Sequence, residues 1–306
     1  MIRWLIRRLW LGLVTVFCVY TLTFLMVIAV PGNPFQQGQH RVAAETEMAL
    51  RARYHMDDNW LYYWEFLRGA ARLDFGPTFM YADWTCNQII GSALPVSVLI
   101  GILAMLTAVM IGVPLGVWAA QHKNSWIDIS CLALVLVGIS LPTFVTGTSL
   151  IVLFCVSWKL LPIGGWGGVS HLVLPVITLA LPFTAYIARL TRSGMFDVLS
   201  QDFVRTAFAK GLAPRRVVWH HALKPALLPV VGYLGPATAQ ALTGSFVVEK
   251  VFGVPGIGQH FVNAALNRDA GLMLGAVLVF STLLVLFNML ADAAYTLIDP
   301  RIRQAL

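Results

Sequence analysis

Six long stretches without Lys, Arg, Asp or Glu dominate this chain of 306 residues. They cover Leu9–Val30, Leu94–Ala120, Ile129–Trp158, Leu172–Ala188, Ala226–Val248 and Ala270–Leu290. A helix needs about 20 apolar residues to cross the hydrocarbon core of a bilayer, where its backbone groups must pair with one another. The sequence lacks the alternating pattern of a membrane barrel. We therefore predict an all-α integral membrane protein with six transmembrane helices.

Composition supports the same class, because 58% of the residues are hydrophobic and only 11% are charged. A soluble domain carries about 25% charged residues. The four cysteines form no Cys-x-x-Cys pair and suggest no disulfide framework. Several prolines lie within the predicted spans: Pro95, Pro114, Pro142, Pro175, Pro182, Pro229 and Pro236. They fit kinked helices of a bundle that opens and closes, and equally the general frequency of proline in membrane helices.

The distribution of basic residues predicts the orientation. Residues 1–8 carry three arginines and no acid, and the segment 189–225 carries seven basic residues and two acids. Because Lys and Arg concentrate in cytoplasmic loops, both segments and the C-terminus are expected on the cytoplasmic side. Residues 9–30 form the first span, which is too long for a typical signal peptide. Residues 31–93 then form an external loop, and residues 94–306 form the membrane core.

The external loop is long enough to have structure or function of its own. Ala43–Tyr54 is expected to be a helix with an ion pair between Glu47 and Arg51. Asn59 is expected to cap a second helix. Trp60, Trp64, Leu67 and Ala71 form a stripe on that helix. The loop can serve as a lid that packs on the bundle or as a surface that docks a substrate-delivery protein, and the sequence leaves both open.

The cytoplasmic segment after the fourth span carries a helix–turn–helix pattern. Ser200 is predicted as an N-cap and Asp202 supplies an acid in the first turn. Lys210 closes this helix, and Gly211 follows in the position that favours a left-handed residue. Pro214 suits the first turn of the next helix. A short helix held by two spans can transmit force from a cytoplasmic partner, although an ordinary basic loop has the same composition.

This segment resembles the EAA loop of permeases from ATP-binding-cassette importers, in the oligopeptide and dipeptide version. The matching stretches are Arg205-Thr206-Ala207-Phe208-Ala209-Lys210-Gly211-Leu212 and His221-Ala222-Leu223-Lys224-Pro225-Ala226. Three further stretches are similar to that family: Asp74-Phe75-Gly76-Pro77-Thr78, Glu249 to Gly258, and the ending Asp292 to Arg301. The resemblance covers nearly the whole chain and is nearest to the oligopeptide-type B subunit. It implies the six-helix fold of a type I importer permease.

The resemblance also implies a role for the cytoplasmic helix, which docks into a separate ATPase subunit in that family. The residues expected to make this contact are Phe203, Arg205, Thr206, Ala207, Lys210 and Gly211. Arg205 stands where the acidic residue of the EAA motif is found, which changes the charge presented to the ATPase. The implied partners are a second permease, two ATPase subunits that bind ATP and Mg, and an external peptide-binding protein. The implied location is the bacterial plasma (inner) membrane.

The residues themselves indicate that energy comes from elsewhere. No Lys, Arg, Asp, Glu or His lies deep in a span, whereas proton-coupled transporters use buried ionisable relays. The chain has no phosphate-binding G-x-x-x-x-G-K-[ST] loop, and no catalytic or metal-binding motif. We therefore expect a transport subunit, not an enzyme, with no cofactor or metal of its own. Glu249 and His260 are expected to be helix-end or packing residues.

Span five is rich in small and polar residues, which allow close packing or line a polar conduit. Thr238, Gln240, Thr243 and Ser245 are the candidate pathway residues. The function expected from these patterns is import of oligopeptides. Dipeptides, glutathione and nickel chelates are alternatives, since their importers share the same motifs. A passive channel or a membrane scaffold is the alternative class, and the helix–Gly–helix segment favours the importer over both.

Overall fold

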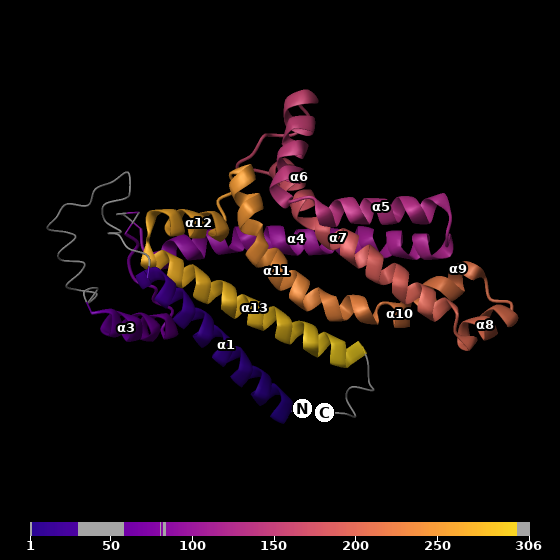
Figure 1. The fold of residues 1–306 in the computed structure, drawn as a ribbon, viewed down its shortest axis with the longest axis horizontal. Coiled ribbons are helices and arrows are strands. Elements are labelled where there is room, and N and C mark those ends of the chain that lie inside the picture. The colour runs from indigo at the N-terminus through magenta and orange to yellow at the C-terminus, as the bar shows by residue number, and fades with distance from the viewer. Residues whose placement is uncertain (1, 30–57, 80, 82–83, 299–306) are drawn as a thin grey trace.

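The computed structural model describes residues 2–29, 58–79, 81 and 84–298. Its long helices α4 (Cys86–Gln121), α7 (Val169–Leu199), α11 (Leu228–Phe252) and α13 (Ala270–Ile298) lie side by side (Figure 1). Helix α1 (Ile2–Ala29) packs along α13. Short helices α8 (Asp202–Ala209) and α9 (Pro214–Arg216) lie at one end of this bundle, and α3 (Asn59–Ala71) and α12 (Ile257–Asn267) lie at the other.

The described residues confirm an all-helical membrane protein. Four helices are long and apolar enough to cross a bilayer, and a bent pair of shorter helices raises the number to five. Helix α11, the predicted fifth span, has 25 residues but is not among them, since Gly, Thr, Gln and Ser lower its hydropathy.

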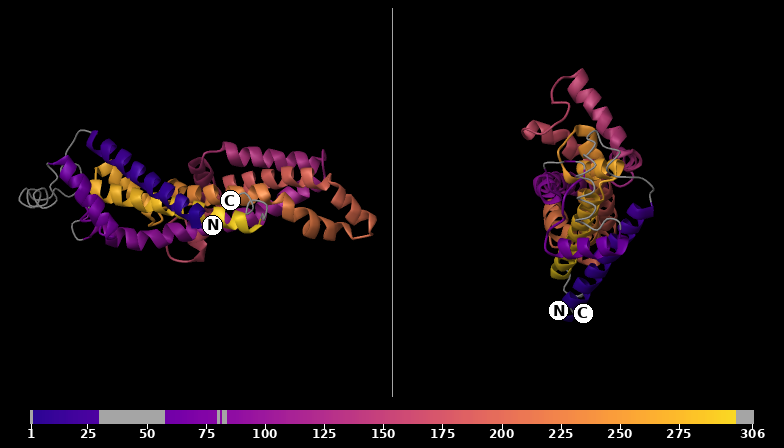
Figure 2. Two further views of the ribbon diagram at one scale, coloured as in Figure 1. Left: turned by 90° about the horizontal axis from the view of Figure 1, so that it is seen from below. Right: turned by 90° about the vertical axis from the view of Figure 1, so that its left-hand side faces the viewer.

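The predicted third span is broken, which corrects the expectation of one helix over Ile129–Trp158. Helix α5 (Trp126–Ser140) ends just before Pro142, and α6 (Thr143–Leu150) continues as a wider π-helix, η2 (Ile151–Ser157). The two arms are bent by 105°. Proline at this position favours the break, because its ring disfavours a helical conformation for the residue before it, and Leu141 is extended here. The α6–η2 arm projects out of the bundle in Figure 1 and in the right-hand view of Figure 2.

Two other boundaries differ from the predictions. Helix α4 begins at Cys86, inside the predicted external loop, because Thr85 and Gln88 form a capping box there. Helix α7 continues eleven residues beyond Ala188 to Leu199, so the predicted cytoplasmic loop begins as helix. The remaining prolines of the spans are compatible with helix: Pro95, Pro114, Pro175, Pro182 and Pro236 lie inside helices, and Pro229 opens α11.

In the first loop, α3 is capped by Asp58 and not by Asn59. The Asp58 carboxylate accepts from the backbone N–H groups of Trp60 and Leu61 at 3.0 and 3.2 Å. Tyr63 and Phe66 form the buried face of α3, and the Tyr20 hydroxyl of α1 donates to the Tyr63 carbonyl at 2.8 Å. Helix α3 therefore packs on α1. The predicted helix Ala43–Tyr54 and the ending at Asp299–Arg301 lie outside the described residues.

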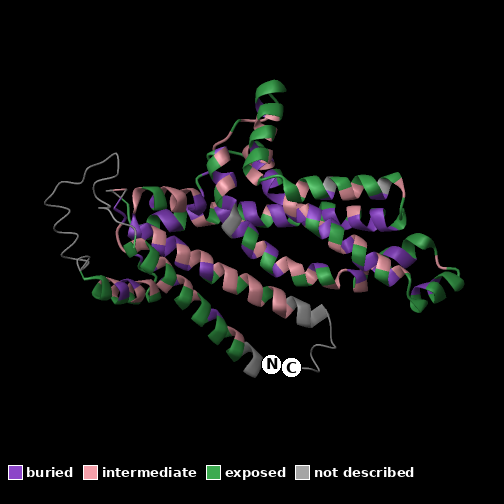
Figure 3. Ribbon diagram, in the orientation of Figure 1, coloured by how far each residue is buried: buried purple, intermediate pink, exposed green. Residues whose placement is uncertain are grey.

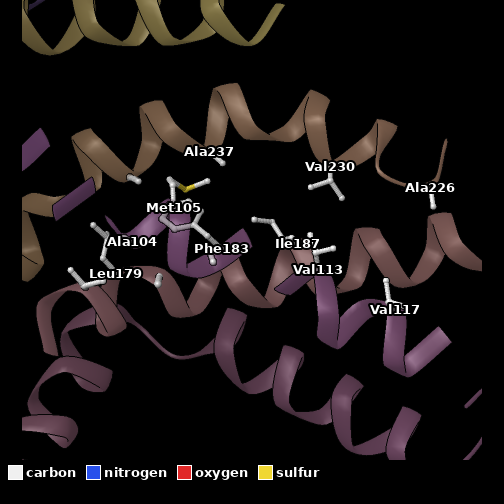
Figure 4. Close-up of a cluster of buried hydrophobic side chains, with 14 of the residues drawn as sticks. Ala104, Met105, Val113, Val117, Leu179, Phe183, Ile187, Ala226, Val230 and Ala237 are labelled. Carbon is white, nitrogen blue, oxygen red and sulfur yellow. The ribbon is translucent and has the colours of Figure 1, made fainter. Parts of the chain in front are cut away.

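The centre of the molecule is the contact of α4 with α7. A Cβ atom on Gly112 would lie 2.8 Å from the Thr184 carbonyl oxygen, and one on Gly116 would lie 2.5 Å from that of Ala188. Spaced four apart on one helix face, these glycines allow the two backbones to approach, as small residues do between membrane helices. Figure 4 shows the neighbouring core side chains, and Figure 3 shows burial concentrated on these helices while α1 and α6 are largely exposed.

We predict that Gly116→Ala weakens this helix pair. Its new methyl group overlaps backbone atoms of α7, and overpacking costs about 1–3 kcal/mol. The expected result is a lower midpoint of thermal unfolding in detergent. Unfolding is measured as the labelling of the buried thiols of Cys86 and Cys155, which become accessible when the protein unfolds. Gly91→Ala is the matched control on the same helix, because nothing lies within 4 Å of its added Cβ. Equal midpoints for both variants would contradict the packing described for Gly116.

Candidate functional site

The predicted cytoplasmic helix exists as α8, Asp202–Ala209. It is preceded by Gln201 as the N-cap residue, which corrects the prediction for Ser200. The Ser200 hydroxyl donates instead to the Asp197 carbonyl at the end of α7, at 2.9 Å. Thr206 donates back to the Asp202 carbonyl within α8, at 2.9 Å.

The turn after α8 follows the prediction. Gly211 has a φ of +75°, and its N–H donates to the Phe208 carbonyl at 2.9 Å. The next residue, Leu212, donates to the Ala207 carbonyl, so the free carbonyls of the helix end are paired. Pro214 then opens α9, as predicted. Through η3 (Val217–Ala222) and α10 (Leu223–Ala226) the chain continues into α11.

Helix α8 presents one face to solvent and one to the bundle. Val204 and Ala207 are buried and belong to the main hydrophobic core together with Val217 and Val218 of η3. The exposed members of the predicted contact set are Phe203, Arg205, Thr206, Lys210 and Gly211. Ala207 is only 8% exposed, so it packs α8 against the hydrophobic core and does not face solvent. The structure thus places most of the set on the outer surface of a helix that its buried residues hold in place.

An ion pair that the sequence analysis missed lies close to this segment. Asp128, in the first turn of α5, is 2% exposed and accepts from Arg192 of α7 in a two-pronged contact, with Nη2 to Oδ2 at 2.7 Å. Asn124 donates its backbone N–H to the same carboxylate at 3.1 Å. The Arg192 guanidinium also lies 4.4 Å from the centre of the Phe196 ring. This pair ties the α4–α5 connection to the part of α7 that leads into α8.

The signal for this pair was present in the sequence but ambiguous. Asp128 stands beside an apolar stretch, and Arg192 was one of seven basic residues in a predicted loop. Only the continuation of α7 as a helix brings them together. By contrast, Arg205 lies 3.7 Å from Asp202 on α8, with both side chains largely exposed. Such a surface pair contributes little to stability.

The predicted pathway residues do not form one lining. Gln240 is exposed on α11, and Thr238 is half-buried with its hydroxyl donating to the Leu234 carbonyl at 2.7 Å. Ser245 is fully buried, which corrects its assignment as a residue facing an open conduit in this conformation. The Thr243 side chain lies outside the described residues.

Ser245 instead belongs to a buried network centred on Glu249, in the last turn of α11. The Glu249 carboxylate is 0% exposed and accepts from the hydroxyls of Ser97 and Ser245 at 2.6 and 2.7 Å. It also accepts from the backbone N–H of Gln259 at 3.2 Å, in the first turn of α12. A carboxylate is favourable at a helix N-terminus. Glu249 therefore links α4, α11 and α12 through hydrogen bonds. This is the helix-end packing role that the sequence predicts for it.

A second buried acid, Asp269, lies at the same end of the bundle, in the layer that contains α3 and α12. It is 1% exposed and accepts from the backbone N–H of Leu272, which caps α13, and from that of Phe79. The Thr78 hydroxyl also donates to it. The sequence analysis recognised Asp74–Thr78 only by resemblance, and the structure shows that the end of this stretch is fastened to α13.

His260 of α12 is a packing residue in this layer. Its ring lies 5.9 Å from that of Tyr81, and burial lowers the pKa of His260, which favours its neutral form. Within the described ranges, no group of three or more His, Cys, Asp or Glu residues is arranged to hold a metal ion.

The comparisons with known proteins agree with this architecture. Residues 112–304 match the family model described as binding-protein-dependent transport system inner membrane component. The chain is 42% identical to the oligopeptide transport system permease protein OppB of Salmonella typhimurium over 99% of this chain and all of the relative. It is 40% identical to the dipeptide transport system permease protein DppB of Bacillus subtilis over 99% of this chain and 98% of the relative.

Among solved structures, the chain resembles the inward-facing MetNI methionine ABC transporter with a TM-score of 0.59 and 17% identity. The match covers 69% of this chain and 97% of the other. At this identity the likeness shows the fold alone. The chain belongs to the family of binding-protein-dependent transport system inner membrane components. Within that family it is a multi-pass permease subunit of the OppB/DppB type from an ATP-binding-cassette transporter.

We predict that Asp128→Asn destabilises the protein. The change leaves Arg192 without its counter-charge in a mostly buried place, and removing one partner of such a pair costs about 3–5 kcal/mol. Thermal unfolding in detergent measures the effect. Arg205→Ala removes the exposed Arg205–Asp202 pair and serves as the control, with little expected change. Equal stability of the two variants would show that Asp128 and Arg192 do not pair in the folded protein.

Proposed function

We propose that this chain is the permease subunit of an oligopeptide importer, crosses the bacterial inner membrane six times and has both termini in the cytoplasm. The observation that supports this proposal most directly is α8, whose exposed face lies at one end of the bundle. This helix is part of the basic segment 189–225, and that segment and the basic residues 1–8 are expected on the cytoplasmic side. The 42% identity to an oligopeptide permease over the full length supports the substrate class.

The sixth crossing in this proposal is α11. With 25 residues and a rise of about 1.5 Å per residue, it is about 37 Å long, which exceeds the hydrocarbon thickness of about 30 Å. Its small and polar residues lower its hydropathy, and such a helix is suited to face protein or a polar conduit. Thr238 and Gln240 are the residues we assign to the conduit, and Thr243 stays in the proposal on sequence grounds.

A peptide passage requires a second, similar permease. The α6–η2 arm projects from the bundle, and its apolar residues Phe144, Val152 and Val156 are each more than half exposed. Two permeases packed through such surfaces enclose more space than one kinked bundle. The remaining partners are two ATPase subunits, which bind ATP and Mg, and an external peptide-binding protein that the layer formed by α3 and α12 faces.

Coupling in this proposal runs through the exposed residues of α8. Phe203, Arg205, Thr206, Lys210 and Gly211 contact the ATPase, and Ala207 keeps the helix against η3. Movement of the ATPase is transmitted to α7 through the short connection before α8, and to α11 through α9, η3 and α10, which follow α8. Dipeptides remain the alternative substrate class, supported by the 40% identity to a dipeptide permease. Glutathione and nickel chelates are further alternatives.

We predict that Gly211→Val uncouples transport from ATP hydrolysis. At a φ of +75° a β-branched residue is strained, while nothing lies within 4 Å of the added Cβ, so the change acts on the backbone of the turn. The measurement is peptide uptake and ATP hydrolysis by the complete transporter in proteoliposomes. Uptake should fall about five- to thirtyfold, because left-handed geometry costs about 1–2 kcal/mol and misaligns α8.

Gly211→Asn is the matched control, since asparagine tolerates the left-handed region, and it should keep most of the uptake. Normal peptide uptake by Gly211→Val would refute the coupling role. Peptide flux through the permeases in the absence of ATPase subunits would instead identify a passive channel.

A further inference from the structure

Two neighbouring recesses lie on the side of the molecule that carries α8 and α9. The first, of about 480 Å³, is formed along α4 by Ile111, Pro114, Leu115, Val117, Trp118 and Gln121, with Trp219 of η3. The second, of about 730 Å³, lies among the ends of α4 and α7 and the α8–η3 segment. Gln121 and Trp219 line both, so the two form one continuous groove.

The groove changes character along its length. Its upper part is lined by Ile111, Pro114 and Leu115, which lie up to ten residues before Gln121 on α4. Ten helical residues span about 15 Å, which is the hydrocarbon thickness of one leaflet. Its lower part includes the exposed residues His122 and Arg215 and the apolar side chains of Phe208 and Pro214. The groove is therefore apolar over one leaflet and basic at its cytoplasmic end.

Charge around the lower part is positive. His122 and Arg215 line the groove, and no carboxylate belongs to either set of lining residues in the described chain. Lys123 follows His122 directly and is exposed. The acids in the flanking helices are Asp128, which is paired with Arg192, Asp202, which lies near Arg205, and the exposed Asp197 of α7. A negatively charged group in the groove thus lies beside the Arg215 guanidinium and meets no carboxylate.

Two tryptophans mark the boundary between the apolar and basic parts. Trp118 is 49% exposed and Trp219 is 41% exposed. Tryptophan is enriched where the hydrocarbon meets the headgroups of a membrane. Basic pockets between helices on the cytoplasmic side bind the headgroups of anionic lipids. The position of these rings matches an occupant with a headgroup below them and an acyl chain above.

We propose that the groove binds one anionic phospholipid of the inner leaflet. The phosphate lies beside Arg215 and His122, and an acyl chain follows Trp118, Leu115 and Ile111 along α4. A cytoplasmic protein domain does not reach the part of the groove at hydrocarbon depth. A transmembrane helix of another permease would satisfy the apolar part but not the basic end. The inference rests on the cytoplasmic placement of α8 and α9, and not on the transported substrate.

The lipid links two parts of the transport machinery. It contacts α4, the central helix of the bundle, and the α8–η3 segment that we assign to ATPase coupling. An anionic headgroup at Arg215 fixes that segment at the membrane surface. Lipid composition is therefore expected to affect coupling, separately from recognition of the peptide.

The test is native mass spectrometry of the full-length chain in detergent, with phosphatidylglycerol or phosphatidylcholine added at equal concentrations. The expected result is retention of one phosphatidylglycerol in preference to phosphatidylcholine. Arg215→Gln should lower this preference about fivefold, since a basic residue near an anionic lipid contributes about 1 kcal/mol. Arg216→Gln is the matched control, because Arg216 is exposed on the same helix but does not line the groove.

A second variant tests the apolar end. Ile111→Trp enlarges a lining residue that is 48% exposed while leaving every charge in place, and it should also reduce retention of phosphatidylglycerol. Equal retention of the two lipids by the natural chain, or an equal effect of Arg215→Gln and Arg216→Gln, would overturn the proposal. Loss of the bound lipid when the ATPase subunits assemble would do so too, because the groove would then be a protein interface. None of these outcomes depends on peptide uptake.

Discussion

The close approach of α4 and α7 is the constraint on which the rest of this structure depends. Lipid chains are as apolar as most side chains, so helices in a bilayer gain little from burying apolar surface against one another. Gly112 and Gly116 allow backbone contact with Thr184 and Ala188. Dispersion over this tight contact then holds the pair together. Helices α11 and α5 pack on the resulting scaffold, and α7 carries the chain out to α8.

Polar side chains fasten both ends of the scaffold. At the end with α8, Asp128 and Arg192 hold the α4–α5 connection against α7. At the opposite end, Glu249 and Asp269 each accept backbone N–H groups at the start of a helix. A buried carboxylate is costly unless its oxygens are hydrogen-bonded, and the described contacts supply that pairing. These groups restrict how the helices shift relative to one another, which is what a subunit moved from outside needs. The groove that we propose as a lipid site lies at the α8 end of the same scaffold.

Much of the fold followed from residue order, including the all-helical class and five of the six helical stretches, as well as the Gly211 turn. Helix α4 extends beyond its apolar stretch because Thr85 caps it earlier in the chain. Helix α7 extends because its last turns bury Met195 and Val198 in the main core. The single span expected at Ile129–Trp158 is divided at Pro142, although other prolines of the chain lie inside intact helices. Local sequence did not distinguish these two behaviours of proline.

The amino-acid sequence by itself determined what must lie in the membrane, where the cytoplasmic turn falls and which family the motifs resemble, because hydropathy, charge bias and left-handed glycine act locally. The tertiary structure alone decided which polar residues meet. Ser245 is far from Ser97 in the chain, yet both donate to Glu249, so a residue expected in a conduit is a packing group. The groove beside Arg215 likewise exists only because the fold places Trp219 of η3 beside the end of α4. Distances between side chains on different helices depend on how the helices pack, which no local pattern records.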